Sequence, residues 1–209
     1  MTRTHLRLIA AAIVALPSLA SAQKITGANV KAAVPAPVAL DTTGMFQAKY
    51  AKVGDDMFIG GQPTEKAIRE LKAQGVTTIV NLRTPPEMDP ARIGFDEEAL
   101  AKQLGIRYVH IPMRGNAEMP YSPENLKKFA DAMSSADGKV LLHCTIAWRA
   151  SHMWAAYLIQ YRGMPVENAL KQTRSINLMD DMRMGAGDKQ PVEELLGRAL
   201  PEVGHPKKP

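Results

Sequence analysis

Short apolar runs alternate along the chain with segments in which apolar residues recur every three or four positions. The run Val76–Leu82 is rich in β-branched and apolar residues and predicts a buried strand, and the continuous apolar run Val140–Leu142 predicts a strand buried on both faces of a sheet. After Ser122 and again after Arg149, apolar residues recur at i, i+3, i+4 and i+7, which predicts helices with one buried stripe. This alternation predicts an α/β domain with a mainly parallel central sheet flanked by helices.

Turn and capping residues set the limits of the other predicted elements. Thr64 stands where an N-cap belongs, after the turn Gly60-Gly61-Gln62-Pro63, and Ser122 precedes a first-turn proline. Gly75, Gly105 and Gly163 each follow a helical pattern. The remaining elements are predicted as strands at Met57–Ile59 and Ile106–Ile111, and as helices at Phe95–Leu104 and from Val166 to Thr173.

The first 22 residues have the three parts of a secretory signal peptide. Arg3 and Arg7 form the positive region, Leu8–Leu16 is the apolar region, and Ala20-Ser21-Ala22 is the cleavage site. The apolar region is too short to span a bilayer, which takes about 20 residues. We therefore expect a periplasmic or secreted protein that is not stably inserted in the membrane after the signal peptide (1–22) is cleaved.

The rest of the chain divides into a linker, one folded domain and a tail. Residues 23–44 are rich in Ala, Val and Pro without an amphipathic period, which predicts a linker. Residues 201–209 contain three prolines and no apolar pattern, which predicts a flexible tail. Residues 45–200 remain for one domain of ordinary size.

Composition and charge exclude several classes of function. Of the 209 residues, 45% are hydrophobic and 22% are charged, as in ordinary globular domains. Two of the 26 basic residues lie in the predicted signal peptide, so the mature chain has 24 basic and 21 acidic residues. The resulting net charge of +3 is too small to indicate a nucleic-acid partner. Because Cys144 is the single cysteine, an intramolecular disulfide framework and a zinc site of cysteine pairs are excluded.

Residues 143–149, His-Cys-Thr-Ile-Ala-Trp-Arg, lie between a predicted strand and a predicted helix, where anions bind in α/β folds. Successive backbone N–H groups can form a concave nest there, and the candidates are those of Thr145, Ile146, Ala147 and Trp148. Arg149 can hold two oxygens of a tetrahedral anion, and the same positive field favours the thiolate of Cys144. The segment supports attack of a thiolate on phosphorus and later hydrolysis of a phosphocysteine.

Four landmarks occur in a fixed order. They are the turn Gly61-Gln62-Pro63-Thr64, a strand ending Asn81-Leu82-Arg83, a strand ending Ile111-Pro112, and His143-Cys144 followed after four residues by Arg149. In these the chain resembles the cysteine-based phosphatases, specifically the bacterial beta-lactamase hydrolase-like or dual-specificity-like group, over about Met45 to Arg174. The resemblance implies a dual-specificity-like phosphatase fold. It also implies that Cys144 is the nucleophile, Arg149 the phosphate clamp, and His143 a neighbour that helps to keep the thiolate.

The resemblance also directs the search for a general acid. In dual-specificity phosphatases this is an aspartate on the loop after the strand that matches Tyr108–Ile111, but the loop here has no aspartate, and Glu118 is the candidate. The alternatives, which stand where acids also cap helices, are Asp89, Asp96 and Glu97. Arg83 follows a strand end at the same edge of the sheet, so it is expected to contact substrate or to form a surface ion pair.

The loop departs from most of the superfamily. Four residues rather than five separate Cys144 from Arg149, as also in rhodaneses, and Ala147 stands where glycine would more easily take left-handed dihedrals. The residue after the arginine is Ala150 where many relatives have a hydroxyl. Trp148 is placed to narrow the mouth of the site or to stack on an aromatic substrate.

We expect an exported, metal-independent phosphatase without a cofactor, acting on a small phosphorylated substrate or a phosphoprotein. One alternative is a rhodanese-like sulfurtransferase with a persulfide on Cys144, against which the landmarks at residues 61–63 and 81–83 count. The other is a catalytically degenerate phosphatase fold that binds an anion or a protein partner. The missing loop glycine, hydroxyl and aspartate favour this second alternative.

Overall fold

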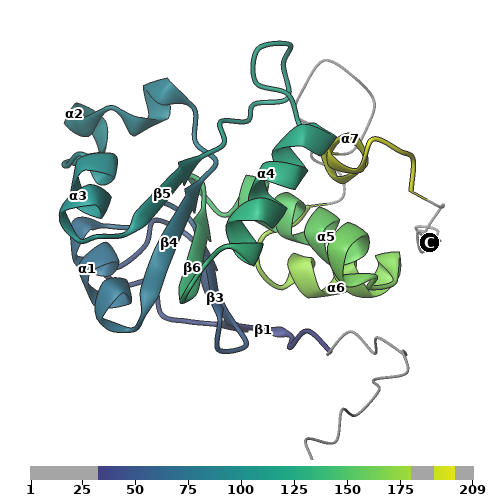
Figure 1. The fold of residues 1–209 in the computed structure, drawn as a ribbon, viewed down its shortest axis with the longest axis horizontal. Helices are drawn as coiled ribbons and strands as arrows, with labels where there is room; N and C mark the ends of the chain where they lie inside the picture. The colour runs from purple at the N-terminus through teal and green to yellow at the C-terminus, as the bar shows by residue number, and fades with distance from the viewer. Residues whose placement is uncertain (1–32, 180–190, 201–209) are drawn as a thin grey trace, which may run out of the picture. The chain divides into compact units, whose positions relative to one another are not determined.

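The computed structural model describes residues 33–179 and 191–200, and a six-stranded sheet lies at its centre (Figure 1). In sheet order the strands are β1 (Pro37–Ala39), β2 (Tyr50–Val53), β3 (Met57–Gly60), β6 (Lys139–His143), β4 (Val76–Asn81) and β5 (Arg107–His110). Strands β3, β6, β4 and β5 are parallel, whereas β2 and β1 extend the sheet antiparallel from β3. The predicted mainly parallel α/β sheet is confirmed.

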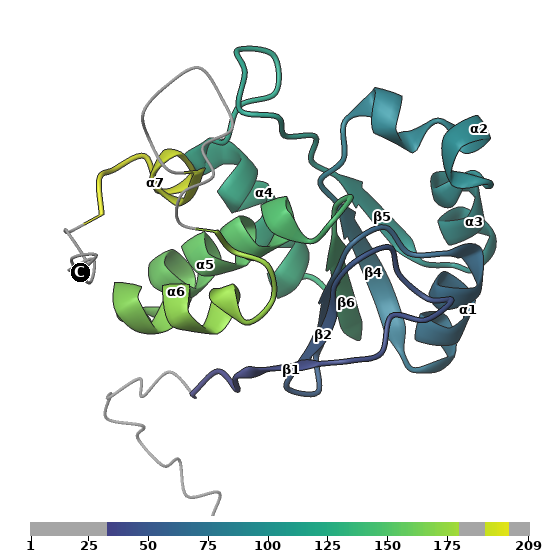
Figure 2. The same ribbon diagram turned by 180° about the vertical axis from the view of Figure 1, so that it is seen from behind.

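Helices pack on both faces of this sheet (Figures 1 and 2). One face carries α1 (Glu65–Ala73) and α3 (Glu97–Gln103), and the other carries α4 (Pro123–Ser134), α5 (Trp148–Arg162), α6 (Val166–Arg174) and α7 (Pro191–Leu196). The 3₁₀ helix η1 (Pro85–Met88) and the short helix α2 (Pro90–Ile93) connect β4 to α3. Each helix layer closes its own apolar core against the sheet.

The predicted capping residues start and end these helices. The Thr64 hydroxyl accepts a hydrogen bond from the Ala67 N–H, and the Ser122 hydroxyl accepts one from the Asn125 N–H. Gly163 ends α5 in the left-handed conformation, with φ of 63°. The strand that Val140–Leu142 predicted is β6, whose neighbours on the two sides are β3 and β4.

Alternate residues of β6 point into the two cores. Leu141 packs in the core on the α1 and α3 side, while Val140 and Leu142 pack on the α4 to α7 side. Cys144, which follows the strand, also belongs to the core on the α4 to α7 side. The chain therefore leaves the sheet at a point where both cores meet.

The sheet takes in residues that the sequence predicted as linker. Strand β1 lies within residues 23–44, and β2 was not predicted either. Both pair through backbone hydrogen bonds at an edge of the sheet, and β1 shows no apolar alternation because it includes Pro37 and leaves Val38 63% exposed. Helices α2 and α7 are too short to show a period in the sequence.

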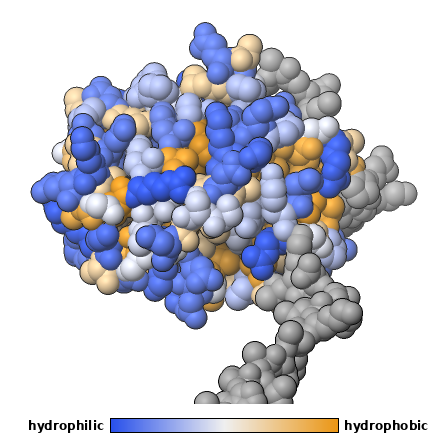
Figure 3. All heavy atoms as spheres, viewed as in Figure 1, coloured by the Kyte–Doolittle hydropathy of each residue, from blue (hydrophilic) through white to orange (hydrophobic). Residues whose placement is uncertain are grey.

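Several predictions concern segments outside the described residues. These are the signal peptide at residues 1–22, residues 23–32 of the linker and the tail at residues 201–209. Among the helices that the structure describes, none is both long and apolar enough to cross a membrane. The face shown in Figure 3 is largely hydrophilic with small apolar areas between polar side chains, because most large apolar side chains lie in the two cores.

Candidate active site

The loop of residues 144–149, here the Cys144 loop, connects β6 to α5 and is held by the turn that follows β3. The Cys144 N–H donates to the Gly60 carbonyl at 3.3 Å, and the Gln62 N–H donates to the Thr145 carbonyl at 2.9 Å. A Cβ on Gly61 would lie 2.8 Å from the Thr145 carbonyl oxygen, so only glycine allows this approach. Cys144 itself is 1% exposed. The landmark turn at residues 61–64 thus fixes the cysteine-bearing loop.

The Cys144 loop presents a run of backbone donors. In the part of the chain that the structure describes, the N–H groups of residues 145, 146 and 148–150 donate to no acceptor, while Ile146 forms an antiparallel bridge with Gly61. Ala147 has φ of 66°, the left-handed conformation that the sequence predicted to be unfavourable for alanine, and α5 begins at the next residue. Unpaired donors before a long helix can bind an anion, and the predicted anion site of this segment rests on them.

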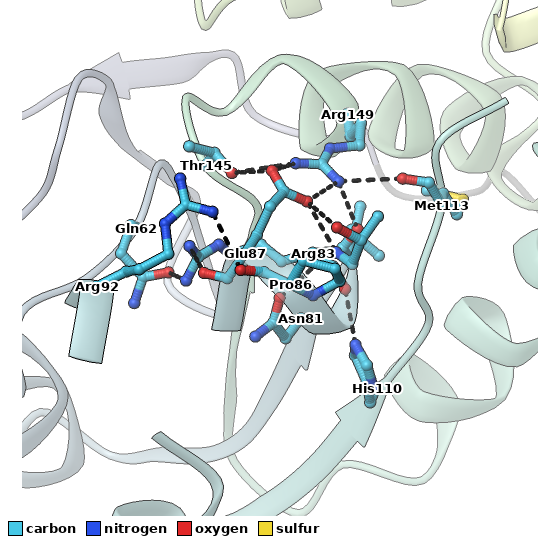
Figure 4. A network of polar contacts seen from close by, with 12 residues as sticks. Gln62, Asn81, Arg83, Pro86, Glu87, Arg92, His110, Met113, Thr145 and Arg149 are labelled. Carbon is cyan, nitrogen blue, oxygen red and sulfur yellow. Dashed lines mark hydrogen bonds and ion pairs between the residues drawn. The ribbon is translucent and has the colours of Figure 1, made fainter. Parts of the chain in front are cut away.

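Arg149 reaches across the site to a carboxylate that the sequence did not predict (Figure 4). Its Nη1 donates to Glu87 Oε2 at 2.8 Å and its Nη2 donates to Glu87 Oε1 at 2.7 Å. Nη1 also contacts the carbonyls of Leu82 at 3.1 Å and Met113 at 3.0 Å, and Nη2 contacts the Thr145 hydroxyl at 3.1 Å. The guanidinium that was expected to hold two oxygens of an anion holds the two oxygens of Glu87.

Glu87 is ionised in this arrangement. Partial burial raises its pKa, but hydrogen bonds from Arg149, from the Thr145 hydroxyl at 2.6 Å and from the Thr84 N–H outweigh that effect and hold the pKa well below 4.5. A carboxylate held in this way accepts protons poorly at neutral pH. Glu87 therefore serves the resting site as an anionic partner of Arg149 and not as a proton donor.

Arg83 is buried, so the surface ion pair that was its alternative role is absent from the described chain. Its Nη1 donates to Gln62 Oε1 and its Nη2 donates to the Glu87 carbonyl (Figure 4). These contacts join the turn after β3 to η1. Arg83 therefore positions the segment that carries Glu87, and its contact with substrate stays a prediction.

His143 lies on the opposite side of the sheet from the Cys144 side chain. It is fully buried, and its Nε2 lies 2.7 Å from Glu97 Oε1. Burial alone would raise the pKa of Glu97, but the His143 charge and several donated hydrogen bonds outweigh it and lower that pKa. Glu97, an alternative candidate for the general acid, is thus held on His143.

The Trp148 side chain lies differently from its predicted role, whereas those of Ile146 and Glu118 are exposed. Trp148 is 3% exposed and packs edge-on to Tyr121 in the α4 to α7 core, so it neither narrows the mouth nor stacks on a substrate, because the first turn of α5 directs it inward. Ile146 is 45% exposed and is the apolar side chain that the loop presents to solvent. Within the described chain, Glu118 is exposed and makes no hydrogen bond or ion pair, so its role stays a prediction.

The two aspartates proposed as alternative acids are helix caps. The Asp89 carboxylate accepts from the Ala91 N–H at 2.9 Å, and the Asp96 carboxylate accepts from the Ala99 N–H at 2.9 Å. Sequence reasoning missed Glu87, although Thr84 and Glu87 have the spacing of a capping box. That signal predicts a helix start and says nothing of a partner 62 residues away in the sequence.

Comparison with known proteins agrees with the landmarks and the fold. The model of one family, described as PTP-NADK, a DSP-PTPase phosphatase fused to NAD+ kinase, matches residues 36–189. A beta-lactamase hydrolase-like protein of Xylella fastidiosa (strain Temecula1) is 29% identical over 108 residues, which span 51% of this chain and 24% of that protein. The chain thus spans about a quarter of the length of this relative.

Solved structures share the fold. A DUF442 protein from Shewanella putrefaciens CN-32 superposes with a TM-score of 0.53 at 25% identity. The match covers 75% of this chain and 92% of the chain of that protein. TpbA of P. aeruginosa superposes with a TM-score of 0.56 at 18% identity and covers 78% of this chain and 91% of its own. The fold, the order of the landmarks and the match over residues 36–189 together show that the chain belongs to the DSP-PTPase phosphatase family.

Proposed function

We propose that this chain is a cysteine-dependent phosphatase that hydrolyses a phosphate monoester through a phosphocysteine on Cys144. The observation that carries the proposal is the Cys144 loop, in which a buried thiol stands beside the Arg149 guanidinium and the unpaired N–H groups of residues 145, 146 and 148–150. Such a set of donors suits the oxygens of a phosphoryl group. The proposed substrates are small phosphorylated molecules or phosphoproteins.

The reaction has two displacements at phosphorus. The Cys144 thiolate attacks phosphorus, the S–P bond forms, and the bond from phosphorus to the ester oxygen breaks with its electron pair leaving on that oxygen. A general acid then supplies a proton to the leaving oxygen. Water gives a proton to the carboxylate of that acid and attacks the phosphocysteine. The S–P bond breaks with its electron pair on sulfur, so phosphate leaves and the thiolate is restored. The loop N–H groups and Arg149 stabilise the charge on the phosphoryl oxygens in both steps.

Arg149 must share its donors when substrate binds. Its four Nη hydrogens meet five acceptors, which are two oxygens of Glu87, the carbonyls of Leu82 and Met113, and the Thr145 hydroxyl. The Nε–H has no acceptor within the described chain. A grip on two phosphoryl oxygens therefore uses Nε and one Nη2 hydrogen, which Glu87 or Thr145 releases. Glu87 orients the guanidinium until that exchange.

Glu118 is the proposed general acid. Glu87 and Glu97 both have lowered pKa values because each is held by donors, so they retain no proton for a leaving group at neutral pH. Glu118 lies on the loop between β5 and α4, which starts at the Arg149 contact made by the Met113 carbonyl. Glu118→Gln is expected to slow turnover of an alkyl phosphate more than that of an aryl phosphate, whose leaving group needs less protonation.

One experiment tests the nucleophile. The purified chain is assayed on 4-nitrophenyl phosphate in the presence of a metal chelator, beside Cys144→Ser and the control Ser151→Ala. The Ser151 hydroxyl is buried and donates to the Ala147 carbonyl at 2.8 Å. Ser151→Ala therefore controls for loss of activity that comes from a small structural change next to the Cys144 loop. We expect Cys144→Ser to abolish release of phosphate and Ser151→Ala to retain it. Turnover that survives Cys144→Ser would refute the assignment.

The same preparation separates the alternatives. Sulfur transfer from thiosulfate to cyanide without release of phosphate would favour the sulfurtransferase. Binding of vanadate without turnover of any phosphate ester would favour the degenerate binding module. Quenched mixtures of Cys144 protein and substrate, examined by mass spectrometry, are expected to contain a phosphorylated peptide that spans residues 144–149.

Export is proposed on the first 22 residues alone. Arg3, Arg7, the apolar region and the Ala-Ser-Ala site support cleavage after Ala22. The mature protein is then expected in the periplasm or the medium, with Gln23 as its first residue. N-terminal sequencing of the chain recovered from each cell fraction tests this, and an intact Met1 in the cytoplasmic fraction alone would contradict it.

A further inference from the structure

One buried carboxylate has no part in the reaction steps proposed above. Glu97, the first residue of α3, is 2% exposed and accepts hydrogen bonds from four different side chains. Its Oε1 accepts from His143 Nε2 at 2.7 Å, Tyr108 Oη at 3.2 Å and Asn81 Nδ2 at 3.3 Å, and its Oε2 accepts from Gln62 Nε2 at 2.8 Å. An acid that only caps a helix accepts from backbone N–H groups of its first turn, whereas Glu97 contacts four side chains from other elements, so it has a further role.

The neighbours fix Glu97 as a carboxylate. Gln62 Oε1 accepts from Arg83 Nη1, and Asn81 Oδ1 accepts from the Arg83 N–H at 2.8 Å, so both amides turn their NH₂ groups toward Glu97. The Tyr108 hydroxyl accepts from Asn81 Nδ2 at 2.7 Å, which leaves its own hydrogen for Glu97. Gln62, Asn81 and Tyr108 therefore all donate to Glu97, and His143 Nε2 completes the set of groups around the carboxylate.

His143 is the partner in direct contact with the Glu97 carboxylate. It is fully buried, whereas Arg83 reaches the carboxylate only through Gln62. The other ring nitrogen of His143, Nδ1, is buried and has no hydrogen-bond partner within the described chain. The contact with Glu97 is therefore what fixes the orientation of the ring on the α1 and α3 side of the sheet.

The ring that Glu97 holds stands one residue from the thiol. His143 is the last residue of β6, and its carbonyl accepts from the Leu82 N–H at 3.0 Å, so its backbone is fixed as well as its ring. Cys144 follows directly, and its own N–H is bonded to Gly60. A change in the charge or position of His143 is therefore transmitted to Cys144 through one peptide unit and across a low-dielectric interior.

We propose that Glu97 is a positioning residue for the nucleophile, which holds the His143 ring in place at the end of β6 so that the Cys144 thiolate is favoured. The inference rests on the proposed function, because it assigns Glu97 a role in preparing the same thiol. It also explains two landmarks of the sequence, since Gln62 and Asn81 both donate to the Glu97 carboxylate.

The other charged groups around the pair are few. Arg83 follows β4, Tyr108 lies on β5, and Glu98 on α3 acts on Tyr108, whose pKa is raised by burial and by the Glu97 charge. Beyond the sheet, Arg149 and Glu87 neutralise one another beside Cys144. Because His143 is the group in direct contact with Glu97, removing the Glu97 carboxylate is expected to affect His143 more than Arg83 or Arg149.

The test measures the reactivity of the thiol directly. Because Cys144 is the single cysteine, the rate of alkylation of the full chain by iodoacetamide reports on this thiol alone. The rate is measured against pH for the natural chain, for Glu97→Gln, and for the matched control Glu98→Gln, an exposed neighbour on α3. We expect the inflection of the profile to rise by about one pH unit in Glu97→Gln and to stay in place in Glu98→Gln.

A double variant shows whether Glu97 acts through His143. In a His143→Gln background, the further change Glu97→Gln is expected to leave the inflection where it is. If Glu97→Gln fails to fold, Tyr108→Phe, which removes one donor from the carboxylate, is expected to shift the inflection in the same direction by a smaller amount. An unmoved inflection in a folded Glu97→Gln, or equal shifts in both backgrounds, would overturn the inference.

The outcome is distinct from failure of the proposed function. If the natural chain alkylates with an inflection near 8.5, as an ordinary thiol does, Cys144 is not activated and the nucleophile assignment itself fails. If the natural inflection is lower and Glu97→Gln retains it, only the role of Glu97 is refuted. The acid limb of the pH profile of kcat/KM for 4-nitrophenyl phosphate is expected to move with the alkylation profile.

Discussion

Replacing Gly61 by alanine is expected to displace the Cys144 loop. The new Cβ would lie 2.8 Å from the Thr145 carbonyl oxygen and 3.0 Å from that of Gln47, whereas ordinary contacts begin at 3.4 Å. Both obstacles are backbone atoms on different segments, so the side chain cannot turn away from them. The loop must retreat by about 0.6 Å, and the hydrogen bond from the Gln62 N–H to Thr145 weakens.

The size of both effects follows from this geometry. Overpacking of this kind costs about 1–3 kcal/mol of folding free energy. A misplacement of 1 Å in an active site costs about 100-fold in rate, so a shift of about half that distance is expected to lower kcat by about tenfold. Gly61→Ala is thus expected to lose both stability and turnover.

Gly105→Ala is the matched control. Its Cβ would meet nothing within 4 Å, but its φ of +62° costs alanine about 1–2 kcal/mol, and it lies at the end of α3, away from the Cys144 loop. The two variants are compared by urea unfolding and by initial rates on 4-nitrophenyl phosphate at a temperature where both are folded. Gly61→Ala with kcat within twofold of Gly105→Ala would show that the contact does not position the loop.

Three further predictions concern the same region. Ala147→Gly removes a buried methyl group but also relieves the left-handed backbone of Ala147, so its free energy of unfolding in urea is expected to stay within about 1 kcal/mol of that of the unmodified chain. Ala150→Gly removes an equivalent methyl group inside α5 without such relief, and it is expected to lose about 2 kcal/mol. Because Glu87 and Glu97 have lowered pKa values in the folded state, the stability they contribute is complete above about 4.5 and is lost as pH falls below it, so the urea midpoint of Glu87→Gln is expected to depend less on pH there. Arg149→Lys keeps the charge but loses the forked geometry, and kcat/KM on an aryl phosphate is expected to fall about 100-fold; a fall below threefold would contradict the clamp.

The sequence predicted the elements whose side chains carry their own signal. The continuous apolar run of β6, the caps Thr64 and Ser122, and the stripe of α5 each reflect burial or a local hydrogen bond, and the structure confirms them. Strand β1 carries no such signal because it pairs only through its backbone. Its recruitment to the sheet depends on where β2 lies, which no local pattern encodes.

The residues of the candidate site likewise include some that the sequence indicated and some that it did not. Cys144 and Arg149 are close in sequence and share one loop, so their spacing alone indicated an anion site. Glu87 and Glu97 come to that site from 62 and 46 residues away, and in the sequence each has the appearance of an acid at the start of a helix. Their roles follow from the packing of η1 and α3 on the sheet, which sequence patterns do not specify.

The ion pair between Glu87 and Arg149 has a consequence for the search for ligands. Because the guanidinium already has an internal anion, a bound phosphate replaces one partner by another, and the affinity reflects the difference between the two. Thermal shift and occupancy both depend on the same dissociation constant, so both decrease with this internal competition. Ligand screens on this protein are therefore best run at high concentrations of phosphate ester.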